Sequence, residues 1–555
     1  MREKPERAMQ NNAKATTTCR GWTCLLPLAA CLPLLGACSH VENLTSSPGI
    51  KNAANSSVSA LNTAMNATGT GLGVAADSVS VFLGGPSEAT GKQQQAQPGK
   101  QKVEIVGVDS KVPQLLKAMG AGETIDVQSA LSDEVQGWDD TLAYCERGRL
   151  AQLQSETDFS LEQLGEALDE IEEFDERAYI SLSDMATHAA SLVVNDNLIP
   201  YEPPPFERVL AYHYQALNYL MKGNLEDAGV EVRRANAAQV AALKAHEEEL
   251  ADAEEEARSR DFSTSPFSNK IDAMLGSTKA VAAQVKNSFQ NAYTFYMSAV
   301  VHELMGEPND AYIDYKKALE IAPKNSVIQR DVARLALDLD MTDDIEAFRK
   351  RFPGPFRAGK TPHTGRSEAV VLFEDGIIPG KTAVAFPLPI PIKSAPGLTM
   401  IAIPIYRASV APVHPLSISQ GGQPLGSTET ICAMDALAVK AYRESIVPMI
   451  IRQIVRASIK GAASALASKH GGLLAGSAVA VYNVLTEVAD TRSWRSLPQN
   501  AQVLRAYVSA GSKLNLVHAA SGARGTVDIP AESGKKVVVR ATRLGSRLFV
   551  QSISF

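Results

Sequence analysis

The sequence predicts a multidomain protein: an all-α solenoid of helical hairpins, followed by an α+β domain that contains a helical insert. Three observations lead to this prediction. The chain has 555 residues, more than one hydrophobic core usually supports. Apolar residues recur every three or four positions over residues 127–355, which is the spacing of helices. From residue 366 they form short runs typical of strands, so we expect the domain boundary near residue 360.

The N-terminal segment has the pattern of a lipoprotein leader. Five basic residues within positions 1–20 precede an uncharged apolar run that ends at Cys38. Such a short run behind a basic leader is typical of a signal peptide and not of a membrane span. Residues 35–38, Leu-Gly-Ala-Cys, resemble the lipobox of bacterial lipoproteins. The resemblance implies a signal peptide over residues 1–37 and an acylated Cys38; an ordinary secretory leader is the alternative.

The residue after the lipobox cysteine bears on the compartment. Ser39 stands where an aspartate would favour retention in the inner membrane. The resemblance therefore implies an outer-membrane lipoprotein that is held on the bilayer by its acyl chains. We expect it to face the periplasm.

The net charge bears on the kind of partner, and the cysteine content bears on disulfide formation. Removal of residues 1–37 takes away five basic and two acidic side chains, so the formal net charge changes from −7 to −10. A protein with this charge lacks the basic surface that nucleic acids require, and we expect no nucleic-acid partner. Cys145 and Cys432 are the cysteines beyond Cys38. We expect two buried free thiols, and a disulfide in an oxidising periplasm is the alternative.

Residues 38–101, which begin with the acylated cysteine, have the composition of a tether. They are rich in Ser, Asn, Gly and Gln. Such a segment cannot bury enough apolar surface to fold firmly. Its expected end-to-end distance of about 45 Å would lift the folded part of the chain clear of the membrane.

The helical region, residues 102–360, contains two copies of one pattern. Residues 206–236 align with residues 291–323, with a glycine and three alanines in the same register. Glycine permits the left-handed residue that ends a first helix, and alanine lets the second helix approach it. These positions resemble the tetratricopeptide repeat, so we expect an all-α TPR-like helical-hairpin solenoid. The shared positions are Gly223 and Gly306, Ala216 and Ala299, Ala228 and Ala311, and Ala235 and Ala318.

The two copies lie farther apart than the repeat length of about 34 residues. An insertion near residues 240–275 accounts for the excess, and it carries two acidic runs. We expect a solvated helix extension followed by a loop. A groove for a basic partner is the alternative.

The last domain, residues 361–555, shows strand-like segments on both sides of a helical stretch near residues 433–487. Prolines in TAVAFPLPIPI and LTMIAIPIYR confine those strands to edges, because proline cannot donate to a ladder. We expect a sheet that draws strands from both sides of the insert.

Motifs of catalysis and cofactor binding are missing from the sequence. The nine histidines never stand at metal-ligand spacing. The segment DGIIPGKTA is one residue short of a phosphate loop, and Pro379 removes a donor that the phosphates need. We therefore expect no cofactor, no metal and no enzymatic activity.

Two groups of residues are candidate sites. In a repeat solenoid the first helices build a concave face that binds peptides or partner helices. By the repeat register, the residues that should line it are His213, Leu217, Tyr293, Tyr296 and Glu303. The second group, Asp490, Arg492 and Trp494, lies in the motif ADTRSWRSLP. There we expect a structural corner in which Arg492 pairs with Asp490 and Trp494 is buried, with a ligand-facing role as the alternative.

The whole pattern resembles an uncharacterised family of proteobacterial lipoproteins that combine a lipobox, TPR-like hairpins and a C-terminal domain with the ADTRSWRSLP motif. The resemblance covers residues 200–500. It implies a domain architecture and a cellular location, and very little about mechanism. We expect a lipid-anchored periplasmic scaffold that binds a protein or peptide partner. The alternatives are an envelope enzyme or envelope-polymer-binding protein with its site in the C-terminal domain, and an accessory factor of secretion or surface-polysaccharide assembly.

Overall fold

The computed structural model describes residues 108–131, 140–181, 201–259, 273, 275–356, 366–390, 397–446, 449–450 and 489–555. All of them belong to the compact unit Val103–Phe555. The predicted leader, Cys38 and the tether lie outside the described residues, as do most of the predicted helical insert and part of the acidic insertion.

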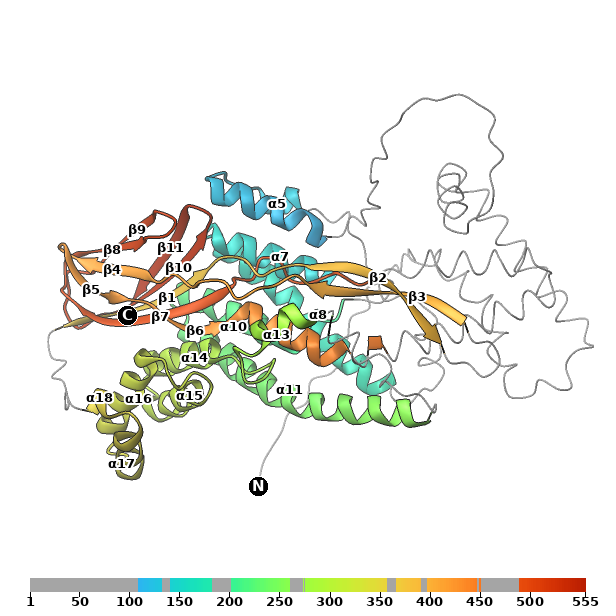
Figure 1. Cartoon of the computed structure of the whole chain (residues 1–555). Coiled ribbons are helices and arrows are strands. Elements are labelled where there is room, and N and C mark those ends of the chain that lie inside the picture. The colour runs from blue at the N-terminus through green and yellow to red at the C-terminus, as the bar shows by residue number, and fades with distance from the viewer. Residues whose placement is uncertain are drawn as a thin grey trace, which may run out of the picture. The chain divides into compact units, whose positions relative to one another are not determined.

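Helices make up the first half of the described chain (Figure 1). They are α5 (Val108–Ala121), α6 (Val127–Ala130), α7 (Asp140–Leu153), α8 (Thr157–Ser181), α10 (Pro205–Met221), α11 (Leu225–Ser259), η2 (Gly276–Thr278), α13 (Lys279–Ala282), α14 (Ala292–Met305), α15 (Pro308–Ile321), α16 (Ser326–Asp338), α17 (Thr342–Arg351) and α18 (Pro353–Phe356).

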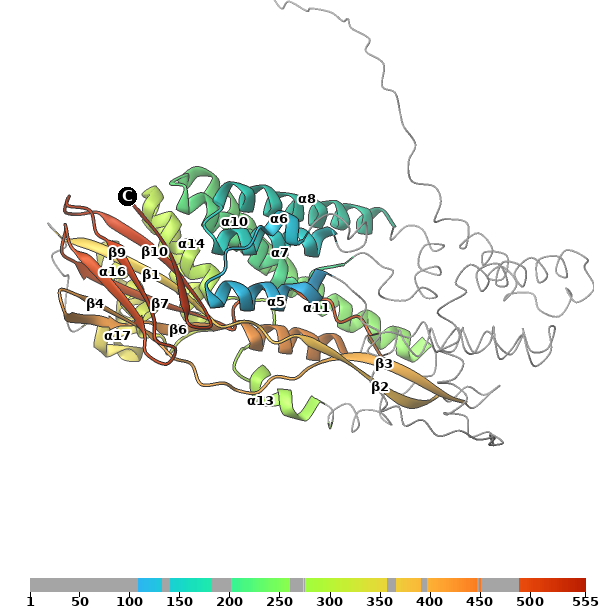
Figure 2. The ribbon, with the colours of Figure 1, turned by 90° about the horizontal axis from the view of Figure 1, so that it is seen from above.

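Three pairs of consecutive helices pack on each other in the described part of the chain: α7 with α8, α10 with α11, and α14 with α15. Figure 2 shows α7 and α8 side by side. The glycines that end α10 and α14, Gly223 and Gly306, both have φ 78°, a conformation that favours glycine. Ala228 and Ala311 are fully buried where each second helix meets its first. The local signals of two helical hairpins in the sequence are therefore present in the structure.

The described strands form three sheets. They are β1 (Ser367–Asp375), β2 (Lys381–Ile390), β3 (Gly397–Tyr406), β4 (Leu416–Gln420), β5 (Gln423–Ser427), β6 (Glu429–Ala433), β7 (Asn500–Val508), β8 (Lys513–His518), β9 (Ala523–Asp528), β10 (Lys536–Leu544) and β11 (Arg547–Ser554). The main sheet has the order β11-β10-β1-β7-β6, a second sheet has the order β5-β4-β8-β9, and β2 pairs with β3. The main sheet draws strands from both sides of the predicted insert, and among its described strands the only parallel pair is β1 with β10.

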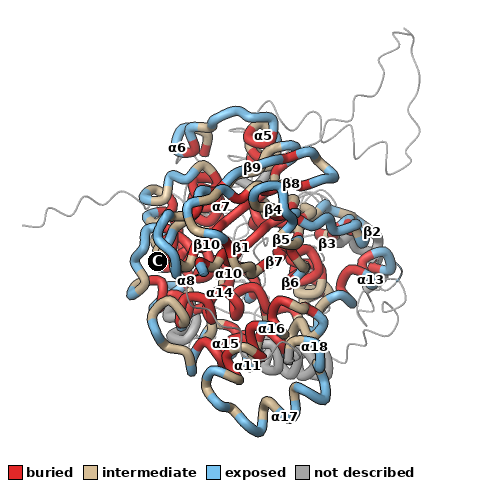
Figure 3. The backbone as a smooth tube through the Cα atoms, turned by 90° about the vertical axis from the view of Figure 1, so that its left-hand side faces the viewer, coloured by how far each residue is buried: buried red, intermediate tan, exposed pale blue. Residues whose placement is uncertain are grey.

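The main sheet is the middle layer of the molecule, between the helices and the second sheet (Figure 3). Alternate residues of β1 show this arrangement. Val370 and Leu372 join the core that is shared with the helices, whereas Val371 and Phe373 face Leu416 and Leu516 of the second sheet. Both faces of β1 are therefore apolar, as in strands covered on two sides. The helical half and the α+β half share this core, although the sequence places a boundary near residue 360.

Both remaining cysteines, Cys145 and Cys432, are buried free thiols. This observation agrees with the first of the two alternatives drawn from the sequence. Burial raises the pKa of both thiols, so they are neutral groups in the core.

The close contact of α7 with α8 generates a stability prediction. A Cβ at Gly148 would lie 2.6 Å from Leu164 Cγ, whereas a Cβ at Gly165 would meet nothing closer than 3.7 Å. Gly148→Ala should lower the free energy of unfolding by about 1–3 kcal/mol through overpacking. Gly165→Ala, the matched control, should raise it by about 0.5–1 kcal/mol because alanine favours a helix. Thermal and urea unfolding of both variants check this, and equal stability of the two would contradict the packing argument.

Candidate functional site

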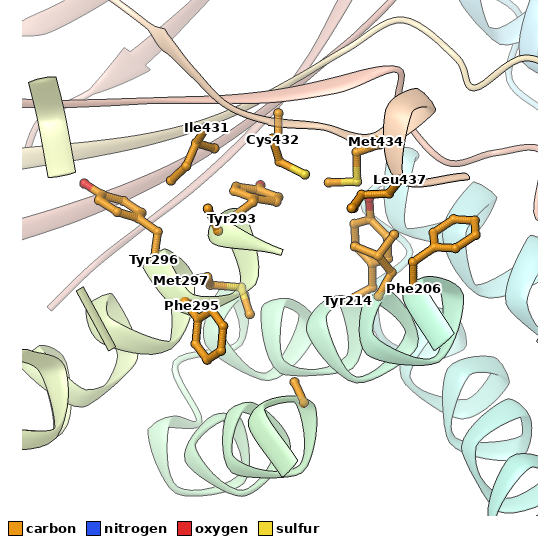
Figure 4. Close-up of a cluster of buried hydrophobic side chains, with 14 of the residues drawn as sticks. Phe206, Tyr214, Tyr293, Phe295, Tyr296, Met297, Ile431, Cys432, Met434 and Leu437 are labelled. Atoms are coloured by element: carbon orange, nitrogen blue, oxygen red, sulfur yellow. The ribbon is translucent and has the colours of Figure 1, made fainter. Parts of the chain in front are cut away.

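The five residues predicted to line a partner groove do come together, but the chain itself covers them. His213, Leu217, Tyr293 and Tyr296 are fully buried, and the Glu303 side chain is 6% exposed. The His213 ring lies 4.6 Å from the Tyr293 ring. Figure 4 shows Tyr293 and Tyr296 on the same side of α14 as Ile431 and Cys432 of β6. The prediction of an open groove is thus corrected: the main sheet packs on this face of the helices.

Glu303 is the centre of an ion cluster at this interface. We use "Glu303 cluster" for Glu303, Asp331, Arg334, Arg505, Lys536 and Glu368. The Glu303 carboxylate lies 2.6 Å from Arg334 of α16, 3.0 Å from Arg505 of β7 and 2.9 Å from Lys536 of β10. It also accepts a hydrogen bond from the Tyr315 hydroxyl at 2.6 Å. One carboxylate of α14 thereby joins α15 and α16 to two strands, β7 and β10.

Asp331 completes the cluster on the helical side. It lies 3.2 Å from Arg505 and accepts a hydrogen bond of 2.9 Å from the Tyr296 hydroxyl. Glu368 of β1 lies 3.7 Å from Arg505. Burial alone would raise the pKa of Glu303, but Arg505, Arg334 and Lys536 hold it well below its ordinary value. Glu303 is therefore a carboxylate throughout the neutral range.

A second buried cluster lies on the same interface, between α7, α10, β1 and β10. The guanidinium of Arg149 binds the Glu374 carboxylate and lies 4.3 Å from the centre of the Tyr214 ring. Thr542 donates to Glu374 at 3.0 Å, and Arg540 donates to the Gln152 carbonyl. Burial lowers the pKa of His213 to about 3, so its imidazole is neutral beside this cluster.

The motif around residue 490 forms a closed corner. Asp490 accepts hydrogen bonds from the Arg492 backbone at 3.0 Å and from its guanidinium at 2.9 and 2.7 Å. Trp494 is fully buried, and its indole N–H donates to the Ser496 hydroxyl at 2.9 Å. The Asp490–Arg492 pair and the buried Trp494 are the features expected of a structural corner.

Two buried carboxylates from the helical half hold this corner, and the sequence analysis did not single them out. Glu207 of α10 accepts a hydrogen bond from the Trp494 backbone N–H at 3.2 Å and another from the Tyr201 hydroxyl. Glu146 of α7 accepts hydrogen bonds from the backbone N–H groups of Arg495 and Ser496. For Glu207 the signal was a glutamate among the apolar residues Leu210, Ala211 and Tyr214 of the same helix face. Burial raises the pKa of Glu146 to about 8.

The other charged residues that the sequence analysis missed carried a comparable signal. Arg505 and Arg540 each interrupt an apolar strand, in VLRAYV and VVVRATR. A charge inside a strand that is apolar on both faces must be paired, because an isolated buried charge is very costly. The sequence pattern therefore predicts that each arginine has a buried partner, but it does not indicate which residue that partner is.

The charged groups of these clusters hold helices and strands together. Each buried carboxylate described above accepts hydrogen bonds or pairs with a cation. Within the described ranges, no three His, Cys, Asp or Glu side chains are arranged to hold a metal ion. Among the helices that are described, none is long and apolar enough to cross a membrane.

Comparison with models of known protein families, with curated proteins and with solved structures finds no match.

The Glu303 cluster predicts acid sensitivity. The unfolded glutamate has the ordinary pKa of 4.5, so it binds a proton before the folded one does. The contribution of Glu303 to the free energy of unfolding is therefore fully present above pH 4.5. It is lost as the pH falls through the lower pKa of the folded state. Glu303→Gln should remove that pH dependence and lower the free energy of unfolding at pH 7 by about 3–5 kcal/mol.

The matched control is Glu346→Gln, which breaks the exposed pair of Glu346 with Lys350. That loss should be about 0.3–0.5 kcal/mol. Denaturant unfolding between pH 3 and pH 7 gives both values. Parallel stability curves for wild type and Glu303→Gln would contradict the assignment.

Glu146 predicts the opposite slope. Its folded pKa of about 8 exceeds the ordinary value of 4.5, so the folded protein keeps a proton that the unfolded chain releases. Wild-type stability should therefore decrease from pH 5 to pH 8, with a slope approaching about 1.4 kcal/mol per pH unit. Glu146→Gln mimics the neutral acid and should abolish this part of the slope. Unfolding followed by Trp fluorescence over that range measures the difference, and a steeper slope in the variant would refute it.

Proposed function

We propose that this chain is a lipid-anchored, non-enzymatic binding protein of the bacterial envelope, built on TPR-like hairpins that carry the sheet domain. Its role is to hold a protein or peptide partner near the outer membrane, on the periplasmic side. In many scaffolds of this kind the concave face is open, but here the main sheet covers the corresponding face of the helices. The partner therefore binds the outer surface formed by the helices and the sheets together.

The TPR-like interpretation is supported by the paired helices. α10 packs on α11, α11 on α14, and α14 on α15, which is the neighbour-to-neighbour order of a solenoid. Left-handed glycines end both first helices, and small buried alanines lie at both crossings. The long α11, with 35 residues, is the departure from a regular repeat.

The observation that carries the proposal is the role of the buried ionisable groups. The Glu303 cluster joins helices to strands, Arg149 pairs with Glu374, and Asp490 pairs with Arg492. Groups engaged in this way are not available to act on a substrate, and a rigid body with pre-set surfaces favours binding. The Asp490–Arg492 pair therefore gives no support to a catalytic site in the C-terminal domain.

The membrane anchor rests on the sequence. Cys38 follows the lipobox residues 35–37 and stands outside the described residues. Several acyl chains on one cysteine would hold the protein on a bilayer almost permanently, because each buried CH₂ contributes about 0.8 kcal/mol.

Cys38→Ser should abolish acylation and shift the protein from the membrane pellet to the soluble periplasmic extract. Mass spectrometry of the N-terminal peptide and fractionation of the envelope measure both effects. Cys432→Ser serves as the control, because a buried thiol far from the leader should leave acylation unchanged. Retention of the Cys38→Ser protein in washed outer membranes would contradict the anchor.

Partner binding is tested separately by crosslinking the wild-type protein in its native envelope. The proposal expects a discrete adduct with one protein or peptide that is absent in a strain lacking the chain. Turnover of peptidoglycan or lipid fragments by the purified protein would overturn the non-enzymatic assignment.

A further inference from the structure

β2 and β3 form a two-stranded ribbon that is separate from the other two sheets. Their register pairs Lys381 with Tyr406 at one end and Ile390 with Gly397 at the other. Among the described strands, neither β2 nor β3 pairs with a third. Figures 1 and 2 show the ribbon extending away from the main sheet. Since a two-stranded ribbon alone is at best marginally stable in water, this one needs a further layer to pack on.

The sequence of the ribbon is apolar on both faces. Residues 382–392 and 394–406 contain no charged side chain. The register places Phe386 and Leu388 on one face, and because successive residues of a strand alternate, the apolar residues between them belong to the other face. At the base of the ribbon, Ile403 is fully buried in the core that the helices share with the main sheet. An apolar surface therefore continues from this core along the ribbon.

Prolines close the edges of the ribbon to further strands. Pro387 and Pro389 lie in β2, and Pro404 lies in β3. Proline has no N–H to donate, so a ladder tolerates it where its nitrogen faces the outer edge. The three prolines thus remove donors that an added strand would need. What remains to be covered is the faces of the ribbon and not its edges.

A helical layer suits these faces better than lipid does. In a bilayer, the outer-edge N–H and C=O groups of both strands would have no hydrogen-bond partner. A helix satisfies its own backbone and can lay an apolar side on a sheet, while the edges of the sheet stay in water. The occupant is therefore expected to be helical.

Residues 451–488, which lie outside the described residues, leave and re-enter the described chain at the base of this ribbon. On the way out, the helix 434–446 carries Tyr442, whose ring centre lies 5.8 Å from that of Tyr406 at the end of β3. On the return, the Arg492 carbonyl accepts a hydrogen bond of 2.9 Å from Lys381 Nζ at the start of β2. Both ends of the segment are thus fixed beside the ribbon.

The length and composition of this segment match the ribbon. Between positions 461 and 486, Lys469 is the only residue with a formal charge. The pair Gly471 and Gly472 is a turn signal near the middle, with 19 residues at 451–469 and 16 at 473–488. As helices these stretches would span about 24–29 Å, and a ten-residue strand spans about 33 Å. One passage out and one back therefore fit the ribbon.

We propose that residues 451–488 run out and back along the ribbon β2–β3 as two helices and cover its apolar surface. The ribbon is the docking surface, and its occupant is a segment of the same chain. This inference goes beyond the proposed function and does not depend on a partner. It predicts that the ribbon is an internal part of the protein, so that a partner has to bind elsewhere.

Crosslinking gives the first test. A photo-crosslinking amino acid replaces Leu388 in the full chain, and the protein is irradiated in its native envelope. We expect adducts with peptides of residues 451–488, in a product that keeps the mass of one chain on a denaturing gel. Lys350 of α17, whose side chain is 76% exposed, is the control position and should give no such adduct. Adducts of position 388 with another protein, with lipid or with a second copy of the chain would overturn the inference.

Hydrogen exchange gives the second test. Leu388→Asp and Leu398→Asp place the same charge on opposite faces of the ribbon. At least one of them should speed amide exchange within residues 451–488 by about tenfold, because the segment opens when its apolar contact is lost. Thr382→Asp, at an exposed position near the base, is the control and should change this exchange by less than about twofold.

The face whose variant gives the larger effect is the one that the segment covers, and unchanged exchange in both variants would refute the docking. If either variant fails to fold, the crosslink at position 388 decides, because it keeps a large apolar side chain there. The partner crosslinking described above is independent of this test. A discrete partner adduct there, together with no product within the chain here, would retain partner binding and reject this inference.

Discussion

The arrangement of the whole described body depends on one carboxylate, that of Glu303, and the three cations that reach it. Arg334 comes from a helix, whereas Arg505 and Lys536 come from two strands more than 200 residues away in sequence. A buried charge is tolerated only when it is paired, so removal of either layer would leave the other with uncompensated charge. The helical layer and the main sheet are therefore complementary in charge as well as in apolar surface.

The same logic recurs at two other points of the interface. Arg149 of α7 meets Glu374 of β1, and Glu146 and Glu207 hold the backbone around Trp494. Each contact joins the first half of the chain to the second, and sequence separations of this size slow folding because long loops must close first. The helices by themselves would expose Tyr293, Tyr296 and His213, which the sheet covers in the complete body. We infer that the helical half reaches its native surface only when the last strands are present.

This packing changes where a partner can bind. The main sheet covers the face of the helices on which a partner groove was expected, and its own outer face is covered by a second sheet. A partner of the proposed kind therefore has to bind outside this covered face.

Local features of the structure could be predicted from the sequence, and long-range ones could not. Helical spacing, Gly223, Gly306 and the paired alanines indicated two hairpins, because a turn and a close helix crossing depend on residues near one another in the chain. The Asp490–Arg492 pair was predictable for the same reason, since its members stand only two positions apart in the sequence. Apolar strands with an internal arginine indicated buried charge but not its partner.

The tertiary structure decided the rest. It brought Glu303 against Arg505 and Lys536, and Glu146 against Ser496, and it closed the face on which a partner groove had been expected. The physical reason is that the spacing of apolar residues predicts only that one face of a helix or strand is buried. An apolar surface accepts any complementary apolar surface, and which one covers it is settled by the packing of the complete chain.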